Sequence, residues 1–204
     1  MKLERFSSIF LVAGFICFIF AFLFLGVWPS MMTDNMPEDG GMPKTVPAEF
    51  KKYYGSLDEY HAALKLGRDI YIKEACWHCH SQYIRPVSNE SAYYGLVSIP
   101  AEYENELNLP QLFGTRRVGP DLVREAGKRS NDWHIAHLYD PKSTVPQSIM
   151  PGFTWYFDES TNPPTPKKGA IALVAYLQNL GKWTENLNRT QHDYDEVTMP
   201  PMPE

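Results

Sequence analysis

The chain has 204 residues, enough for one sizeable domain with an appendage. Its net charge is −5, so it lacks the basic excess of a protein that binds nucleic acid. Three cysteines exclude a disulfide scaffold in a chain of this length, and 17 prolines indicate long irregular connections.

The first predicted element is a membrane-spanning helix over residues 6–28. These residues contain no charged side chain, and at about 1.5 Å per residue they span roughly 34 Å, more than a hydrocarbon core of about 30 Å. A cleaved signal peptide has a shorter apolar region of about 7–15 residues and a small-residue cleavage site, which the stretch 26–30 does not provide. We therefore expect a retained membrane anchor.

The charges beside this helix predict its orientation. They are Lys2 and Arg5 before the helix and Asp34, Glu38 and Asp39 after it. The positive-inside rule then places residues 1–5 in the cytoplasm and exports everything after residue 28. Residues 1–28 carry a net charge of +1, which leaves −6 on the exported part and favours basic partners.

The exported part is expected to be mainly α-helical. Residues 29–55 contain four prolines and an adjacent pair of glycines, which predicts a linker with no packed core. A domain is expected over residues 56–181, where a capping box at Ser56–Glu59 begins an amphipathic helix that leads to Cys76. Residues 182–204 are expected to form an irregular tail.

Further along this domain, the prolines in residues 86–113 indicate a loop. Ser130 is a typical residue for the start of a short helix, which Pro141 stops. A final helix is expected over residues 167–180, with Gly181 as its C-cap. No convincing strand pattern is present. Gly67 and Tyr71 on the first helix are expected to meet Leu173 and Tyr176 on the last, because a small residue permits close helix crossing.

The run Cys76-Trp-His-Cys79-His80 has the C-x-x-C-H spacing of covalent haem attachment. In such a site the two thiols add across the haem vinyl groups and the adjacent histidine binds the iron. A zinc knuckle would need a second pair of ligands at similar spacing, and no cysteine follows Cys79. A thioredoxin-like dithiol would need alternating strands and helices. The run therefore predicts one covalently bound haem c outside the cytoplasm.

The sixth iron ligand has to come from further along the chain. Met150 lies in a proline-bounded loop before the final helix, the place from which small c-type cytochromes take their distal methionine. His134 and His137, three residues apart on the short helix, are the main alternatives, and the methionines of residues 29–55 with Met199 and Met202 are more remote ones. A thioether ligand raises the haem potential relative to two histidines, which suits the oxidising end of a respiratory chain.

The stretch Gly119-Pro120-Asp-Leu122 supplies candidate contacts around this haem. The Pro120 carbonyl can accept the Nδ1–H of His80 and fix its tautomer, and Leu122 is expected to pack on the haem face. Arg116 and Arg117, just before this stretch, either pair with haem propionates or are solvated.

Four stretches resemble, in order, the mono-haem subunit II of the cbb-type cytochrome c oxidases, the C-family of haem–copper oxidases. They are residues 79–86, 117–122, 132–138 and 145–151. The resemblance covers roughly residues 1 to 181 and implies a membrane-anchored class I cytochrome c. Tyr83 and Val118 depart from it, since relatives often have Met and Thr at these positions.

The resemblance implies an electron carrier with no catalytic residue of its own. Electrons would come from a di-haem cytochrome c subunit or a soluble cytochrome c. They would pass through this haem to the haem–copper catalytic subunit, which reduces dioxygen to water. The family has a calcium ion at the subunit interface, which Ser81 is a candidate to contact. The implied location is the bacterial inner membrane, with the haem domain in the periplasm.

Three other interpretations stay open. The chain is also similar in plan to the cytochrome c subunit of nitric oxide reductase, whose partner reduces nitric oxide, although the stretch 81–86 favours the oxidase. A haem sensor would leave the sixth iron position open. A free-standing membrane-anchored shuttle would dock to several enzymes instead of belonging to one complex.

Overall fold

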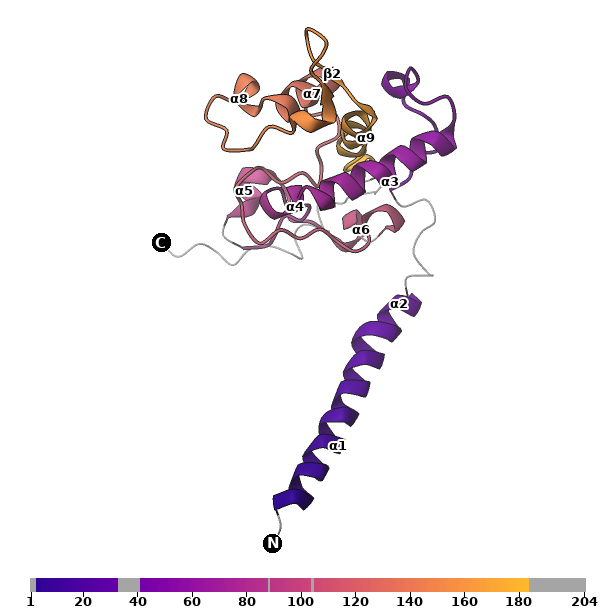
Figure 1. Cartoon of the computed structure of the whole chain (residues 1–204), viewed down its shortest axis with the longest axis vertical. Coiled ribbons are helices and arrows are strands. Elements are labelled where there is room, and N and C mark those ends of the chain that lie inside the picture. The colour runs from indigo at the N-terminus through magenta and orange to yellow at the C-terminus, as the bar shows by residue number, and fades with distance from the viewer. Residues whose placement is uncertain (1–2, 33–40, 88, 104, 184–204) are drawn as a thin grey trace. The chain divides into compact units, whose positions relative to one another are not determined.

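The computed structural model describes residues 3–32, 41–87, 89–103 and 105–183. The chain divides into two compact units, Met1–Pro37 and Glu38–Glu204. Figure 1 shows a first unit that is a single helical rod and a second that gathers short helices and loops around two longer helices.

The first unit consists of α1 (Leu3–Phe22), a π-helical turn η1 (Leu23–Val27) and α2 (Trp28–Met32). Its stretch Ser7–Met31 is long and apolar enough to cross a membrane, which agrees with the predicted anchor. The helix was expected to end at Trp28, but it continues past Pro29 to Met32. Proline cannot donate to the carbonyl four residues earlier, and the wider turn before it, in which the Trp28 N–H bonds to the Leu23 carbonyl, makes room for the ring.

The orientation expected for this helix stays a prediction. Lys2, Asp34, Glu38 and Asp39 lie outside the described residues.

The second unit is centred on α3 (Leu57–Lys73) and α9 (Lys168–Leu177), which pack directly against each other. The predicted start of α3 is confirmed, since the Ser56 side chain accepts the Glu59 N–H at 3.2 Å. In α9 every residue from Ala170 to Leu177 is buried. This helix is therefore the centre of the core, and it ends at Leu177, three residues earlier than predicted.

The predicted crossing of these two helices is confirmed, with one change of partner. A Cβ on Gly67 would lie 2.1 Å from the Ala172 carbonyl oxygen and 2.7 Å from Tyr176 Cβ. Gly67 therefore faces Ala172 where Leu173 was expected. The rings of Tyr71 and Tyr176 meet with their centroids 5.7 Å apart. Only glycine permits this approach of two helix backbones.

The expected linker is wrong for residues 41–55, which belong to the core of the second unit. Phe50, in the short helix η3 (Ala48–Phe50), is 1% exposed, and Tyr54 is 6% exposed. Both rings pack on Tyr60 of α3, with centroids 5.6 and 5.7 Å away. The prolines and glycines do produce irregular backbone here, but the aromatic side chains supply enough apolar surface to bury it.

The other elements are short. They are α4 (Cys76–Cys79), α5 (Glu90–Tyr94), α6 (Pro100–Tyr103), η4 (Glu106–Asn108), α7 (Asn131–Tyr139), α8 (Pro141–Thr144), η5 (Thr154–Tyr156), β1 (Phe157–Asp158) and β2 (Thr165–Pro166). The start of α7 is as predicted, because the Ser130 side chain accepts the Trp133 N–H at 3.1 Å. Two predictions need correction: residues 86–113 contain short helices, and β1 pairs antiparallel with β2.

The described start of the expected tail is packed on the domain. The Trp183 indole donates to the Glu102 carbonyl at 3.0 Å, and the ring lies against the core. The rest of the tail, 184–204, lies outside the described residues.

Candidate functional site

A sharp turn at the end of α3 positions the thiols of Cys76 and Cys79. Ala75 adopts a left-handed conformation (φ +57°), which is uncommon for a residue other than glycine and lets α4 begin at once. Cys76 and Cys79 are three residues apart on this one helical turn, so their side chains share a face. Both are free thiols, the first half-buried and the second exposed. Burial, with a contribution from Glu74, raises the pKa of Cys76 to about 12, so this thiol is neutral.

His80 follows as the C-cap of α4, and its ring orientation is set by a hydrogen bond. Nδ1 lies 2.9 Å from the Pro120 carbonyl oxygen, as the sequence predicts. A carbonyl can only accept, so Nδ1 carries the proton and Nε2 carries the lone pair. Burial lowers the pKa of His80, although the Pro120 carbonyl opposes that shift. The neutral ring is the form that binds a metal ion.

Backbone contacts hold the two sides of this hydrogen bond together. The Gly119 N–H donates to the Cys79 carbonyl and the Leu122 N–H to the Ser81 carbonyl, both at 3.0 Å. A Cβ on Gly119 would lie 2.2 Å from His80 Cε1, so a larger residue there would push the imidazole out of place. Tyr71 also donates its hydroxyl hydrogen to the His80 carbonyl.

Met150 lies in the loop between α8 and η5. Its side chain is half-buried and packs against the core, and its N–H donates to Ser148 Oγ at 3.2 Å. Ile149, beside it, is 79% exposed, so this loop reaches the surface. The Met150 side chain thus lies at the border between core and solvent.

The two alternative ligands differ in their hydrogen bonds. His134 is 5% exposed and burial lowers its pKa to about 4, so the ring is neutral, and its Nε2 lies 3.7 Å from Glu125 Oε1 and makes no hydrogen bond within the described part of the chain. His137 shares a hydrogen bond with Thr144 Oγ1 at 2.6 Å and stacks on Trp133. Burial lowers the pKa of His137, and electrostatic repulsion from the nearby His80 lowers it further. Both histidines therefore stay alternatives to Met150.

Comparison with known families shows which family the chain belongs to. The family model described as "Cytochrome C oxidase, mono-heme subunit/FixO" matches residues 2–167, most of the sequence. The chain belongs to the FixO family. It is thus a mono-haem cytochrome c subunit of an oxidase, in agreement with the resemblance seen in the sequence. Among curated proteins, no relative matches the chain.

The residues described above fit the one haem c that the FixO family implies. Two free thiols share one face of α4, a neutral histidine follows them with its Nδ1 already bonded, and glycine leaves room for its ring. A thioether faces the border of the core in the segment where a sixth ligand is expected. This donor set, two thiols with one imidazole and one thioether, is that of a c-type cytochrome.

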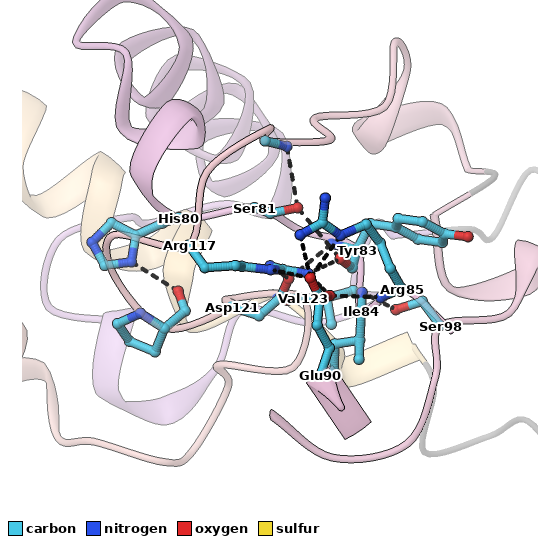
Figure 2. A network of polar contacts seen from close by, with 12 residues as sticks. His80, Ser81, Tyr83, Ile84, Arg85, Glu90, Ser98, Arg117, Asp121 and Val123 are labelled. Atoms are coloured by element: carbon cyan, nitrogen blue, oxygen red, sulfur yellow. Dashed lines mark hydrogen bonds and ion pairs between the residues drawn. The ribbon is translucent and has the colours of Figure 1, made fainter. Parts of the chain in front are cut away.

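Arg117 was expected either to pair with a haem propionate or to be solvated. In this FixO chain its Nη1 donates to Asp121 at 2.5 Å and its Nε to Glu90 at 2.9 Å, so its guanidinium contacts carboxylates of the protein instead. Figure 2 shows Arg117 between these two acids. Arg116 is exposed and stays a candidate for the propionates.

Ser81, the candidate calcium contact, is 1% exposed. Its Oγ accepts the Gly114 N–H at 3.1 Å and donates to the Tyr83 carbonyl at 3.4 Å. In the part of the chain that the structure describes, no group of three or more His, Cys, Asp or Glu side chains is placed to hold a metal ion. The calcium contact stays a prediction.

The sequence did not predict the charge cluster of Arg85, Glu90, Arg117 and Asp121, in which both carboxylates are buried. Glu90 accepts hydrogen bonds from Arg85, five positions before it in the sequence, and from Arg117, 27 positions after it. Burial alone would raise the pKa of Glu90, but hydrogen bonds from Arg117 and Arg85 outweigh burial and lower it to about 2. The available signal was a glutamate near arginines, which does not distinguish a buried cluster from a solvated surface.

Proposed function

We propose that this chain is the electron-relay subunit of a membrane-anchored terminal oxidase. It passes electrons through one covalently attached haem c to the haem–copper catalytic subunit. The observation that carries the proposal is the geometry of His80, which follows two thiols on one helical turn and has its Nδ1–H bonded to the Pro120 carbonyl. When bound, the haem supplies a one-electron iron couple.

The chain's own residues attach, orient and shield that group. Cys76 and Cys79 would form the two thioether links, and the Nε2 of His80 would bind the iron on one side. Met150 is proposed as the ligand on the other side, because its thioether makes no hydrogen bond that competes with a metal and its loop packs on the core. Leu122, half-buried beside the Ser81 backbone, would cover the haem face.

The membrane helix and the charge of the chain support a location and a set of partners. A helix able to span the bilayer over Ser7–Met31 would tether the domain to the bacterial inner membrane. The positive-inside rule favours the periplasmic side for the haem domain. There a di-haem cytochrome c subunit or a soluble cytochrome c would be the donor. The exported part has a net charge of −6, which would favour basic surfaces on such partners.

The attachment site is tested by replacing Cys76 and Cys79 together with Ala. The double variant is expected to lose covalent haem, measured as haem-dependent peroxidase staining of the denatured chain on a gel. The matched control is Cys17→Ala in the membrane helix, which leaves the C-x-x-C-H run intact and is expected to keep the stain. Staining of the double variant at the wild-type level would reject the proposed site.

The distal ligand is tested by comparing three single variants. Met150→Leu removes the thioether and is expected to lower the midpoint potential and to abolish an absorption band near 695 nm in the oxidised protein, a band expected of methionine ligation at the level of this family. His134→Ala and His137→Ala are expected to keep a six-coordinate, low-spin iron. If His137→Ala becomes high-spin and Met150→Leu does not, His137 is the ligand.

A further inference from the structure

Two segments far apart in the sequence run side by side at the axial histidine. The first is 79–83, which follows the haem motif, and the second is 117–123, which includes Pro120. Besides the backbone bonds from Gly119 and Leu122, the Tyr83 N–H donates to Asp121 Oδ2 at 3.1 Å. The side chain of Asp121 thus joins the two segments one residue after the carbonyl that His80 contacts.

Asp121 is fixed by three donors and is 3% exposed. Its Oδ1 accepts the Val123 N–H at 2.8 Å, while its Oδ2 accepts from Tyr83 and from Arg117 Nη1 at 2.5 Å. The oxygen that accepts from His80 belongs to the peptide group between Pro120 and Asp121. Because a peptide group is rigid and planar, holding Asp121 in place also limits rotation of that carbonyl.

Arg117 connects this carboxylate to the rest of the cluster shown in Figure 2. Its Nη2 donates to the Tyr83 carbonyl at 2.6 Å and its Nε to Glu90 at 2.9 Å, and it also pairs with Asp121. A guanidinium can serve three acceptors at once because its donors are arranged in a planar fork. The Arg117 side chain therefore forms hydrogen bonds to the segment 79–83, to Asp121 and to Glu90 of α5.

We propose that Arg117 and Asp121 are positioning residues for the axial histidine. They hold the Pro120 carbonyl opposite His80 Nδ1 and so keep Nε2 directed at the iron position. The inference deepens the proposed function, since it takes His80 as the axial ligand. An ion cluster this deeply buried gains little net stability over an apolar replacement, so a role in fixing geometry accounts for its presence at this place.

The test is the exchange rate of the His80 Nδ1 proton, measured by NMR on the full-length, reduced, haem-containing chain in detergent. A bonded proton exchanges only when its hydrogen bond opens. Arg117→Gln frees Asp121 and is expected to speed this exchange at least tenfold, equivalent to about 1.4 kcal/mol in the opening equilibrium. The matched control is Arg124→Gln, which removes another largely buried guanidinium, bound to Glu102 at 2.8 Å. The control is expected to stay within twofold of the wild-type rate.

A second readout uses Arg117→Lys, which keeps the charge but replaces the planar fork, with its donors on three separate nitrogens, by a single ammonium nitrogen. A weaker bond to Pro120 makes the His80 ring a poorer electron donor, so the midpoint potential is expected to rise. If Arg117→Gln does not accumulate, Arg117→Lys and Arg124→Lys give the same exchange comparison.

The outcomes separate this inference from the proposed function. Equal acceleration by the Arg117 and Arg124 variants, or none in either, overturns the positioning role. So does an unchanged or lowered potential in Arg117→Lys. Absence of covalent haem from the wild-type chain overturns the proposed function itself, because His80 would then have no iron to bind.

Discussion

Glu90→Gln is the substitution that perturbs this charge cluster without replacing a candidate haem ligand. The side chain of Glu90 is 4% exposed and its carboxylate accepts from both Arg85 and Arg117. Glutamine has nearly the same shape, but it is neutral and presents an NH2 group where the carboxylate has a second acceptor oxygen. The variant therefore leaves Arg117, whose side chain is 14% exposed, with too few acceptors, whereas Arg85, at 34% exposed, can still reach water.

The magnitude follows from the pKa of Glu90. The folded protein lowers it from 4.5 to about 2, and each pKa unit corresponds to about 1.36 kcal/mol, so the charged form is favoured by about 3 kcal/mol. Breaking a buried ion pair costs about 3–5 kcal/mol, which agrees with this figure. We expect Glu90→Gln to lower the free energy of unfolding at pH 7 by about 3 kcal/mol.

The assay is urea unfolding of the detergent-solubilised full chain, followed by tryptophan fluorescence. With a denaturant slope of about 2 kcal/mol/M, the midpoint is expected to fall by about 1.5 M. The matched control is Glu106→Gln, which removes an exposed pair with Lys65 at 3.4 Å, where the glutamate side chain is 61% exposed. An exposed pair contributes about 0–1 kcal/mol. Equal midpoint shifts in the two variants would refute the reasoning.

The same variant predicts a pH dependence. Because the folded state lowers the pKa of Glu90, its contribution is fully present above about pH 4.5 and is lost as the pH falls toward 2. The difference in unfolding free energy between wild type and Glu90→Gln is therefore expected to shrink over that range. A difference that stays constant from pH 7 to pH 3 would contradict the assignment of a buried, charged Glu90.

Three further substitutions test the packing and the site. Gly67→Ala places a Cβ 2.1 Å from the Ala172 carbonyl and is expected to cost about 2 kcal/mol in thermal unfolding, despite better helix propensity; an unchanged melting temperature would contradict this. Ser130→Ala removes the N-cap of α7 and is expected to cost about 1 kcal/mol, with Ser130→Thr as the conservative control. Gly119→Ala meets His80 Cε1 at 2.2 Å and is expected to reduce the low-spin fraction in the absorption spectrum, so a wild-type spectrum would count against it.

The features that sequence reasoning predicted correctly depend on short-range signals. Ser56 and Ser130 are helix caps whose partners lie three residues away. The C-x-x-C-H run places its thiols by spacing alone. The bond between His80 and Pro120 spans 40 positions, but it was predictable because the tautomer of a ligating histidine needs an acceptor.

The features that were missed depend on tertiary burial. Prolines and glycines in residues 41–55 do produce irregular backbone, yet Phe50 and Tyr54 are buried because α3 offers Tyr60 as a partner. The sequence around Arg117 does not show whether its guanidinium pairs with a haem propionate or with a carboxylate of the protein. α5 and α6 have five and four residues, too few to show helical periodicity.

The central claim is that electrons reach oxygen through the haem of this chain. The most direct test is to mix the isolated, fully reduced native complex with oxygen and to follow the haem c absorption band of this subunit in a stopped-flow instrument. This haem is expected to be oxidised within a single turnover. Complexes carrying the Cys76→Ala and Cys79→Ala changes are expected to lose donor-driven oxygen consumption. Oxygen consumption at the full rate while the haem of this chain stays reduced would contradict the relay.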